Sequence, residues 1–587
     1  MLVYGERSRT ADPRALIEML RAELADAPAL VADIRRHAAL VAALIAAGEL
    51  AQGLADAALK TSGVDGPDPA SEAAMALTSA LARAVLASWR SGFAVAPDLA
   101  PACALLNALP ALPLPPTVTT KVGEGYAFYA LYPEAHAEAA AALGPEPTTV
   151  VGLRSIGTSL AAMVAAALDA PPPLTVRPVG PPFRRELSLS PEYAAALSED
   201  GGAQPARRYA VVDEGPGLSG SSFGAVLDRL EAGGVSRERI VVFPGHAGDL
   251  GPEADPVHRA RWAALDRRVI GFEALALETP EPAHRLKSWV ADLTGPAVAP
   301  LEDLSGGLWR SRRFADEAAW PPSHTQQERR KYRLHSDRGA YLLKFAGLGR
   351  TGERKLARAR ALAASGFSPE PLGLRHGFLV ERWIEPAHAA RPSLDRLAAY
   401  LGFRARTFPA GADDGASVEG LFAMAHANTA EGLGSRAAAA VEPWRERLGD
   451  LQYRSRPVFT DGRLHAWEWI AGPDGRVLKT DAVDHADAHD LIGAQDIAWD
   501  VAGATMEFDL GHTAAEALRR AVERVAGRAV NTELTGFLRL AYLAFQLGAW
   551  TMAAQAHDGR DEHARLTAAR DRYAEQLSRA TASAARA

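Results

Sequence analysis

The chain has 587 residues, of which 48% are apolar, a formal net charge of −7 and a single cysteine, Cys103. This length predicts two to four domains, and the composition excludes a disordered chain or a strongly basic nucleic-acid-binding protein. A single cysteine excludes an internal disulfide framework and cysteine-based metal clusters, which favours a cytoplasmic protein. The best candidate for a membrane span, residues 538–552, contains Arg539 and Gln546, so we expect no membrane segment.

Residues 1–115 are predicted to form a helical domain. Residues 14–106 are rich in Ala and Leu at helical spacing, and Asp12-Pro13 is typical of a helix start. Four prolines between Leu109 and Pro116 would stop any helix, which places a domain boundary near residue 115.

Residues 116–298 are predicted to form an α/β domain with a parallel sheet. Short β-branched runs alternate here with Ala/Leu-rich helical stretches, a pattern typical of parallel strands joined by helices. The clearest strands are expected at residues 148–153, 209–212 and 240–244.

The most informative stretch of this domain runs from Val211 to Ser222. A buried strand ends there in Asp213 and Glu214, and a Gly/Ser loop then leads into a helix that starts near Phe223. Backbone N–H groups at a helix start bind anions, and carboxylates accept hydrogen bonds from vicinal hydroxyls. The stretch therefore predicts a site for a phosphorylated sugar, with an ordinary strand, turn and capped helix as the alternative.

Two further segments carry groups suited to phosphate. Residues 154–159 form a second small-residue loop between a strand and a helix, and open α/β sheets bind ligands at the edge where such loops lie. Arg177, Arg184 and Arg185 follow, and guanidinium groups bind phosphate in bidentate fashion. Exposed surface arginines are the alternative interpretation.

Together these segments resemble the phosphoribosyl-diphosphate motif of type I phosphoribosyltransferases. The resemblance implies a catalytic acidic pair, Asp213 and Glu214, that holds the ribose hydroxyls, with Mg²⁺ bridging hydroxyls and diphosphate. By the same resemblance the 5′-phosphate would contact Ser219, Gly220, Ser221 and Ser222, and the diphosphate would contact Arg154, Ser155, Gly157, Arg177, Arg184 and Arg185. The loop is one residue longer than the family pattern, around Gly215 to Gly217, which leaves a related sugar phosphate open as the ligand.

Residues 299–587 are predicted to form a third domain with a small lobe (299–385) and a large lobe (386–587). Residues 331–335 and 340–345 indicate an antiparallel hairpin, whose second strand carries Lys344 in an apolar run. Glu353 opens a helical stretch, and residues 377–383 indicate another strand. A surface lysine in an edge strand is the alternative interpretation of Lys344.

This order of elements resembles the aminoglycoside phosphotransferase and choline kinase group. The resemblance implies that Lys344 contacts nucleotide phosphates and that Glu353 orients it. Residues 461–468 match the catalytic pattern of the group, but Arg463 takes the place of the catalytic Asp and Glu468 that of the metal-binding Asn, while the metal-binding Asp481 is intact. Arginine does not accept a proton at neutral pH, so the resemblance implies a degenerate kinase that binds Mg²⁺, with ATP as the candidate nucleotide.

The sequence thus predicts a multidomain protein with an all-α segment, a parallel α/β domain and a two-lobed α+β domain. The preferred function is glycosyl transfer from a Mg²⁺-bound phosphoribosyl diphosphate or related sugar phosphate, coupled to a nucleotide-binding lobe pair. Two alternatives remain: a non-catalytic nucleotide sensor or scaffold, and an atypical small-molecule kinase whose base comes from the cluster between Asp484 and Asp490. The expected partners are a sugar phosphate and a nucleotide, with neither nucleic acid nor membrane.

Overall fold

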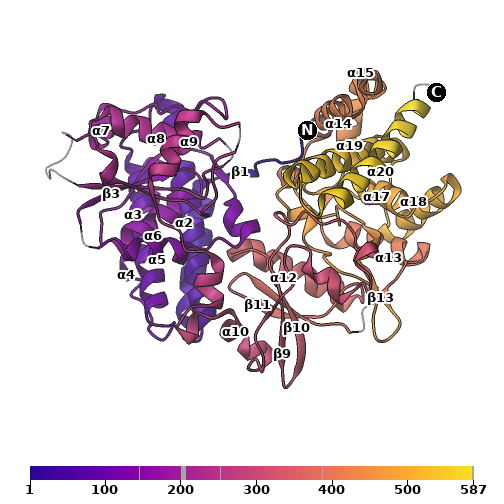
Figure 1. The fold of residues 1–587 in the computed structure, drawn as a ribbon, viewed down its shortest axis with the longest axis horizontal. Coiled ribbons are helices and arrows are strands. Elements are labelled where there is room, and N and C mark those ends of the chain that lie inside the picture. Colours follow the sequence, from indigo (N-terminus) through magenta and orange to yellow (C-terminus); the bar gives the residue numbers. More distant parts are fainter. Residues whose placement is uncertain (145, 200–206, 218, 252, 386–387, 585–587) are drawn as a thin grey trace.

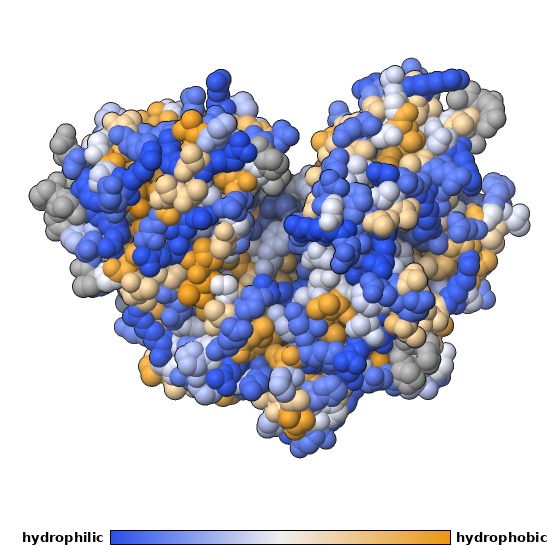
Figure 2. Space-filling model, in the orientation of Figure 1, coloured by the Kyte–Doolittle hydropathy of each residue, from blue (hydrophilic) through white to orange (hydrophobic). Residues whose placement is uncertain are grey.

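The computed structural model describes residues 1–144, 146–199, 207–217, 219–251, 253–385 and 388–584. Figure 1 shows two bodies side by side, one formed by the first half of the chain and one by its last third. The small sheet of strands β9 to β11 lies below and between them in that view. A notch separates the two bodies at the top of the same face in Figure 2.

The first body is built from a mixture of long helices and short strands. In chain order it contains β1 Ser8–Ala11, α1 Pro13–Asp26, α2 Ile34–Ser62, α3 Pro69–Arg90, α4 Ala100–Ala108, β2 Val118–Lys121, the π-helical turn η3 Gly125–Tyr129, α5 Pro133–Ala141, β3 Thr148–Leu153, α6 Gly157–Ala167, β4 Leu174–Val176, α7 Pro191–Ala196, β5 Arg208–Val212, α8 Ser221–Ala232, β6 Ile240–Phe243, α9 Pro256–Ala264, β7 Asp266–Arg267, α10 Leu286–Trp289 and α11 Ala291–Thr294.

The remaining elements form the second body. They are β8 Glu302–Asp303, β9 Lys331–Ser336, β10 Gly339–Phe345, α12 Gly349–Ala364, β11 Pro371–Arg375, β12 Phe378–Arg382, β13 His388–Ala389, α13 Leu394–Thr407, α14 Val418–Leu433, α15 Ser435–Ala438, α16 Leu448–Arg454, β14 Pro457–Val458, β15 Trp469–Ala471, β16 Val477–Lys479, β17 Gln495–Asp496, α17 Ala498–Glu507, α18 His512–Ala526, α19 Thr532–Ala556 and α20 His563–Ala584.

A five-stranded parallel sheet forms the centre of the first body, as the sequence predicts. Its strand order is β4-β3-β5-β6-β7, and Val151 of β3 lies beside Val211 of β5. The strands are short apolar runs because both faces of the sheet are covered, which is typical of parallel sheets. The carboxyl ends of β3 and β5 therefore place the loops after them at one edge.

The N-terminal helices share a core with this sheet instead of forming a core of their own. One continuous apolar cluster joins Ile17 and Leu44 to sheet residues such as Val212 and to small-lobe residues such as Phe345. Gly48 of α2 permits the close approach, because a Cβ atom there would lie 2.8 Å from Cβ of Ser159 on α6. The predicted boundary near residue 115 therefore separates two parts of one packed unit.

Two of these core helices also meet the length and composition criteria for a membrane span. They are α2 and α3, and 67% and 61% of their most apolar windows are buried inside the protein. A buried core helix meets the same criteria, so these features are weak evidence for a membrane segment. The stretch 538–552, which appeared the best candidate in the sequence, lies within the core helix α19.

The second body has an antiparallel sheet packed beside a largely helical lobe. The sheet order is β11-β12-β10-β9-β8, and helix α12 packs against β11. A second apolar cluster, centred on residues such as Trp499 and Phe545, fills the large lobe. These features confirm the multidomain α+β organisation.

Two segments from outside the large lobe pack against it. Residues 304–330, between β8 and β9, reach the large lobe, where Arg310 forms a buried ion pair with Glu562 (Nη1 to Oε1, 2.7 Å). The chain before β1 also lies on the large lobe, because the Leu491 N–H donates to the Val3 carbonyl at 2.8 Å. The large lobe is therefore packed against two segments that lie far from it in the sequence.

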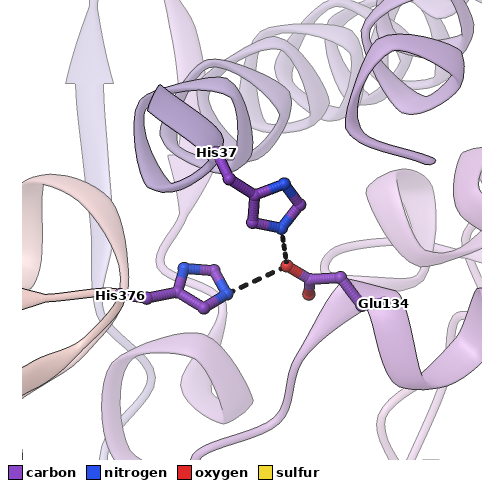
Figure 3. Close-up of side chains that lie close together, drawn as sticks. All are labelled: His37, Glu134 and His376. Atoms are coloured by element: carbon purple, nitrogen blue, oxygen red, sulfur yellow. Dashed lines mark hydrogen bonds and ion pairs between the residues drawn. The ribbon is translucent and has the colours of Figure 1, made fainter. Parts of the chain in front are cut away.

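A buried histidine–glutamate–histidine group lies where the first body meets the small lobe (Figure 3). His37 on α2 and His376 in the β11–β12 turn each place Nε2 beside the same Oε1 atom of Glu134 on α5, at 2.7 and 2.9 Å. All three side chains are at most 1% exposed. Burial raises the pKa of Glu134, but the two imidazoles outweigh it and hold that pKa well below its ordinary value. The carboxylate therefore links α2, α5 and the small lobe.

Replacing Glu134 with Ala would leave two buried imidazole N–H groups without an acceptor. We expect a loss of about 3 kcal/mol in the free energy of unfolding, since each unsatisfied buried donor costs about 1–3 kcal/mol. Differential scanning calorimetry should show a lower Tm for Glu134→Ala, while Glu446→Ala, which removes an exposed carboxylate, should leave Tm nearly unchanged. Equal Tm values for the two variants would contradict the structural role of Glu134.

Candidate functional site

A cavity of about 240 Å³ lies where the small lobe, the large lobe, residues 304–330 and the η3 turn meet. Its walls carry aromatic, acidic and basic side chains, including Tyr4, Phe128, Tyr129, Trp309, Arg313, Arg329, Lys331, Glu381, Trp383, Arg463, His465, Glu468, Asp481, Asp484, His489, Asp490 and Trp550. Concave sites with a few convergent polar groups are the usual places for small-molecule binding.

A buried ion cluster lies beside this cavity. Strand β10 places Lys344, which is 2% exposed, with Nζ at 2.8 Å from Oδ1 of Asp481 and 2.6 Å from Oδ2 of Asp484. Burial lowers the pKa of Lys344, but the two carboxylates raise it well above its ordinary value. Burial raises the pKa of Asp481, but the ammonium groups of Lys331 and Lys344 outweigh burial and hold that pKa well below its ordinary value. Both groups are therefore charged at neutral pH.

Helix α12 contributes a lysine to the cluster, whereas Glu353 lies elsewhere. Lys355 is fully buried, and its Nζ is 3.2 Å from Oδ1 of Asp484. Burial lowers the pKa of Lys355 to about 8. Glu353 is exposed on the same helix, where its charge neighbours are Glu23 and Arg350. The partner that orients Lys344 is thus a carboxylate pair of the large lobe, and not Glu353 as the sequence implied.

Glu468 lines the cavity but is already paired. Its Oε2 contacts Lys479 Nζ at 2.5 Å, and its Oε1 contacts His485 Nε2 at 3.1 Å. Burial raises the pKa of Glu468, while Lys479 and His485 lower it to about 2. Asp461 also lies 3.3 Å from the same lysine nitrogen. The Lys479 ammonium group thus already occupies the position between the Glu468 and Asp461 carboxylates.

Arg463 faces the cavity in the position where the sequence pattern expects an acid. Its guanidinium contacts Oδ2 of Asp490 at 3.0 Å and lies over the Phe545 ring at 5.3 Å. Asp490 is 4% exposed and also lines the cavity. Asp490 is therefore the carboxylate that pairs with the arginine at the expected catalytic position.

The η3 turn brings two residues to the cavity that the sequence did not assign to it. The aromatic residues of this turn lie in different surroundings. Tyr126 is buried in the core, whereas Phe128 and Tyr129 line the cavity. Residues 125–129 form a π-helical turn. Such turns are frequent at functional sites.

The acidic pair after β5 lies in the first body, near the base of η3. Burial raises the pKa of Asp213 to about 7, and burial together with Glu124 raises that of Glu214 to about 8. Gly157 packs against this strand end, because a Cβ atom there would lie 2.7 Å from the Val212 carbonyl oxygen. The structure therefore brings together the two loops that the sequence placed at one edge.

The hydroxyl groups of the Gly/Ser loop are engaged within the protein. Ser219 and Ser221 both donate to the Pro182 carbonyl oxygen, at 2.8 and 2.6 Å. Gly220 has φ +63°, a left-handed conformation that glycine adopts easily, and it is the N-cap residue of α8, in which Ser222 is the second residue. Leu218 lies outside the described residues.

Two of the predicted diphosphate ligands are paired with carboxylates of the helical segment. Arg154, 6% exposed, contacts Asp56 at 2.9 Å and also Asp65, while Arg177 contacts Asp56 and lies 3.3 Å from the Ser155 hydroxyl. In contrast, Arg184 is exposed, and Arg185 donates to the Pro178 carbonyl at 3.2 Å. Because Asp56 and Asp65 are distant in sequence, the pattern gave no sign of this pairing.

Comparisons with known proteins give matches only among solved structures. No family model matches the chain, and no curated protein matches it significantly. Choline kinase LicA from Streptococcus pneumoniae is 19% identical, covering 51% of this chain and 98% of its own, with a TM-score of 0.33. Spectinomycin phosphotransferase in complex with ADP and spectinomycin is 12% identical over 53% and 100% of the two chains, with a TM-score of 0.33. Macrolide 2′-phosphotransferase type I is 15% identical over 49% and 95%, with a TM-score of 0.31.

The predicted glycosyltransferase of the phosphoribosyltransferase type is wrong. The similar structures are kinases and phosphotransferases, and a phosphoribosyltransferase-like domain is not confirmed. The contacts within the protein offer a physical reason: Arg154 and Arg177 are neutralised by Asp56 and Asp65, and the loop serines bond to Pro182. Groups that would bind a diphosphate sugar are thus used to hold the first body together.

The raised pKa values of the acidic pair make stability depend on pH. The folded state retains a proton on Asp213 up to about pH 7, whereas the unfolded carboxyl releases it near pH 4, so stability falls as pH rises through this window. We expect Asp213→Asn to raise Tm by about 2 °C or more at pH 8 and to have little effect at pH 4.5.

The matched control is Asp26→Asn, which alters an exposed carboxylate. Its effect on Tm should be small at both pH values. If Asp213→Asn shifted Tm equally at pH 4.5 and pH 8, the raised pKa of Asp213 would be excluded.

Proposed function

We propose that the cavity between the lobes binds a magnesium-bound nucleoside triphosphate and transfers its terminal phosphoryl group to a small-molecule alcohol. The observation that carries this proposal is the buried pairing of Lys344 with Asp481 and Asp484 beside the cavity. A cation for the phosphates and a carboxylate for the metal, held on facing lobes, are the two groups that phosphoryl transfer requires.

The residues present fit Mg²⁺, which prefers carboxylate oxygens. Asp481 and Asp484 line the cavity, and their current partners are ammonium groups, whose charge a bound cation can replace. Glu468, which the sequence suggested as a ligand, has both oxygens engaged with Lys479 and His485 and fits less well. When bound, Mg²⁺ would neutralise the charge on the phosphates, and Lys344 would contact and orient them.

A second candidate is a nucleotide sensor that binds without turnover. Arg463 favours it, because a guanidinium at the expected position of the base does not accept a proton. The two functions differ in a single measurement, since a sensor binds Mg²⁺–ATP and forms no ADP. Asp490 and the histidines of the cavity offer other proton acceptors, which is why we prefer the phosphotransferase.

Isothermal titration calorimetry with Mg²⁺–ATP tests the site directly. Lys344→Ala and Asp481→Asn should each weaken binding by at least tenfold, or about 1.4 kcal/mol, because each removes a charge that faces the phosphates or the metal. Lys60→Ala, at an exposed lysine of α2, serves as the control and should bind as the wild type does. Circular dichroism would confirm that each variant is folded. Equal affinity in all four proteins, or no binding to the wild type, would exclude the proposed site.

A further inference from the structure

A tyrosine hydroxyl is hydrogen-bonded to a histidine, whose other ring nitrogen lies beside a glutamate, across the seam between the two bodies. The hydroxyl of Tyr129, on η3, lies 2.5 Å from Nδ1 of His489. Nε2 of the same ring lies 3.0 Å from Oε2 of Glu124, immediately before η3. His489 belongs to the large-lobe loop that follows β16, so the group assembles only where the two bodies meet.

One neutral form of the imidazole satisfies both contacts. The Tyr129 hydroxyl donates to Nδ1, which is nearer than the other available acceptor, Oε1 of Gln327 at 3.4 Å, and the protonated Nε2 lies beside the Glu124 carboxylate. A hydroxyl, an imidazole and a carboxylate in this order are the arrangement in which a hydroxyl passes its proton to the ring and the carboxylate stabilises the resulting imidazolium.

The packing around His489 fixes the direction of its ring. The ring is nearly parallel to that of Phe128, with centroids 5.8 Å apart and planes inclined by 4°, and Tyr4 covers it at 5.3 Å. Arg329 donates to the Phe128 carbonyl at 2.6 Å and lies over the Phe128 ring, and it also donates to the Asp487 carbonyl of the large lobe at 3.4 Å. Catalytic groups need this kind of fixed orientation.

Tyr129 and His489 also line the cavity in which the nucleotide is proposed to bind. The same cavity is lined by Asp481 and Asp484 on the phosphate side and by Arg463 at the position where the sequence pattern expects a base. Arg463 leaves the reaction without its usual proton acceptor. A hydroxyl already bonded to an oriented imidazole is a suitable replacement.

We propose that Tyr129, His489 and Glu124 together accept the proton of the acceptor alcohol; this proposal rests on the phosphotransferase function above. The acceptor oxygen forms a bond to the terminal phosphorus as the bond from that phosphorus to the bridging oxygen breaks, which releases a nucleoside diphosphate. The acceptor proton moves to the Tyr129 oxygen while the tyrosine proton moves to Nδ1 of His489. The imidazolium formed is paired with Glu124 and returns its proton to water after product release.

In this scheme Tyr129 is the catalytic residue, because it alone touches the acceptor, and His489 and Glu124 are positioning residues. Two of the three groups come from the first body. The α/β half of the chain therefore completes the active site of the lobes. The charged and titratable groups that face this relay are Tyr4, Glu124, Tyr129, Arg329, Arg463 and Asp490.

The experiment uses the full-length protein, with Mg²⁺–ATP as the probe and water as the acceptor. Single-turnover ADP formation is measured from pH 5 to pH 9, and Mg²⁺–ATP affinity is measured separately by calorimetry. Tyr129→Phe and His489→Gln should lower the rate at least about 100-fold, the usual contribution of a general base, with affinity within twofold of the wild type. The matched controls are Tyr453→Phe, at an exposed tyrosine, and His426→Gln, at a half-buried histidine; neither residue lines the cavity, and both variants should retain the wild-type rate.

Glu124→Gln distinguishes a proton relay from a purely structural contact. The wild-type rate should rise with pH as the imidazole loses its proton. In Glu124→Gln the rate should fall about tenfold. The rise in rate with pH, which is the acid limb of the pH profile, should move to lower pH because the imidazolium has lost its carboxylate partner. A contact that only supports the fold would leave the position of the limb unchanged.

The possible failures are separable. Normal Mg²⁺–ATP binding with undiminished ADP formation in Tyr129→Phe and His489→Gln would overturn the relay and leave the proposed function standing. Normal binding with no ADP formation by the wild type would also overturn the relay and favour the sensor. Absence of Mg²⁺–ATP binding by the wild type would overturn the proposed function and the relay with it.

Discussion

The structure of the lobe pair depends on one buried ion cluster. Lys344 and Lys355 of the small lobe meet Asp481 and Asp484 of the large lobe, and both lysines are almost fully excluded from water. Charges in such a place must be paired, because an isolated buried ion costs several kcal/mol. The lobes are therefore held together across the cavity, and a phosphate that enters must take over the carboxylates' contacts with Lys344.

The need to pair buried charges also explains the contacts at the sheet edge of the first body. Its N-terminal helices share a core with the parallel sheet, and Asp56 of α2 and Asp65 of the α2–α3 loop neutralise Arg154 and Arg177 at the sheet edge. The edge that in the sequence appears to be a diphosphate site is thereby closed. The first body instead presents Phe128 and Tyr129 to the cavity of the second body. The two halves therefore share one site rather than carrying one each.

Local patterns in the sequence predict the strands and helices, but they do not predict which distant residues contact one another. The strands at 148–153 and 209–212 and the hairpin around Ser336 to Gly339 follow from apolar runs and turn residues, and Lys344 was recognisable as an isolated cation in a strand. The partners of these residues come from distant segments, such as Asp484 for Lys344 and Asp65 for Arg154. Such pairings depend on tertiary packing, which a single sequence does not reveal. For this reason the sequence suggests Glu353 as the partner of Lys344 and gives no sign of the roles of Lys355 and Tyr129.

The central claim is that one cavity, built by both bodies, binds a metal–nucleotide through Lys344 and Asp481. A crystal structure of the full-length protein with Mg²⁺ and a non-hydrolysable ATP analogue tests it most directly. Our account predicts phosphate oxygens at Lys344, the metal at Asp481, and the terminal phosphate facing Tyr129. Nucleotide bound instead at the loop of Ser219 to Ser222, with Lys344 still paired to Asp481 and Asp484, would contradict it.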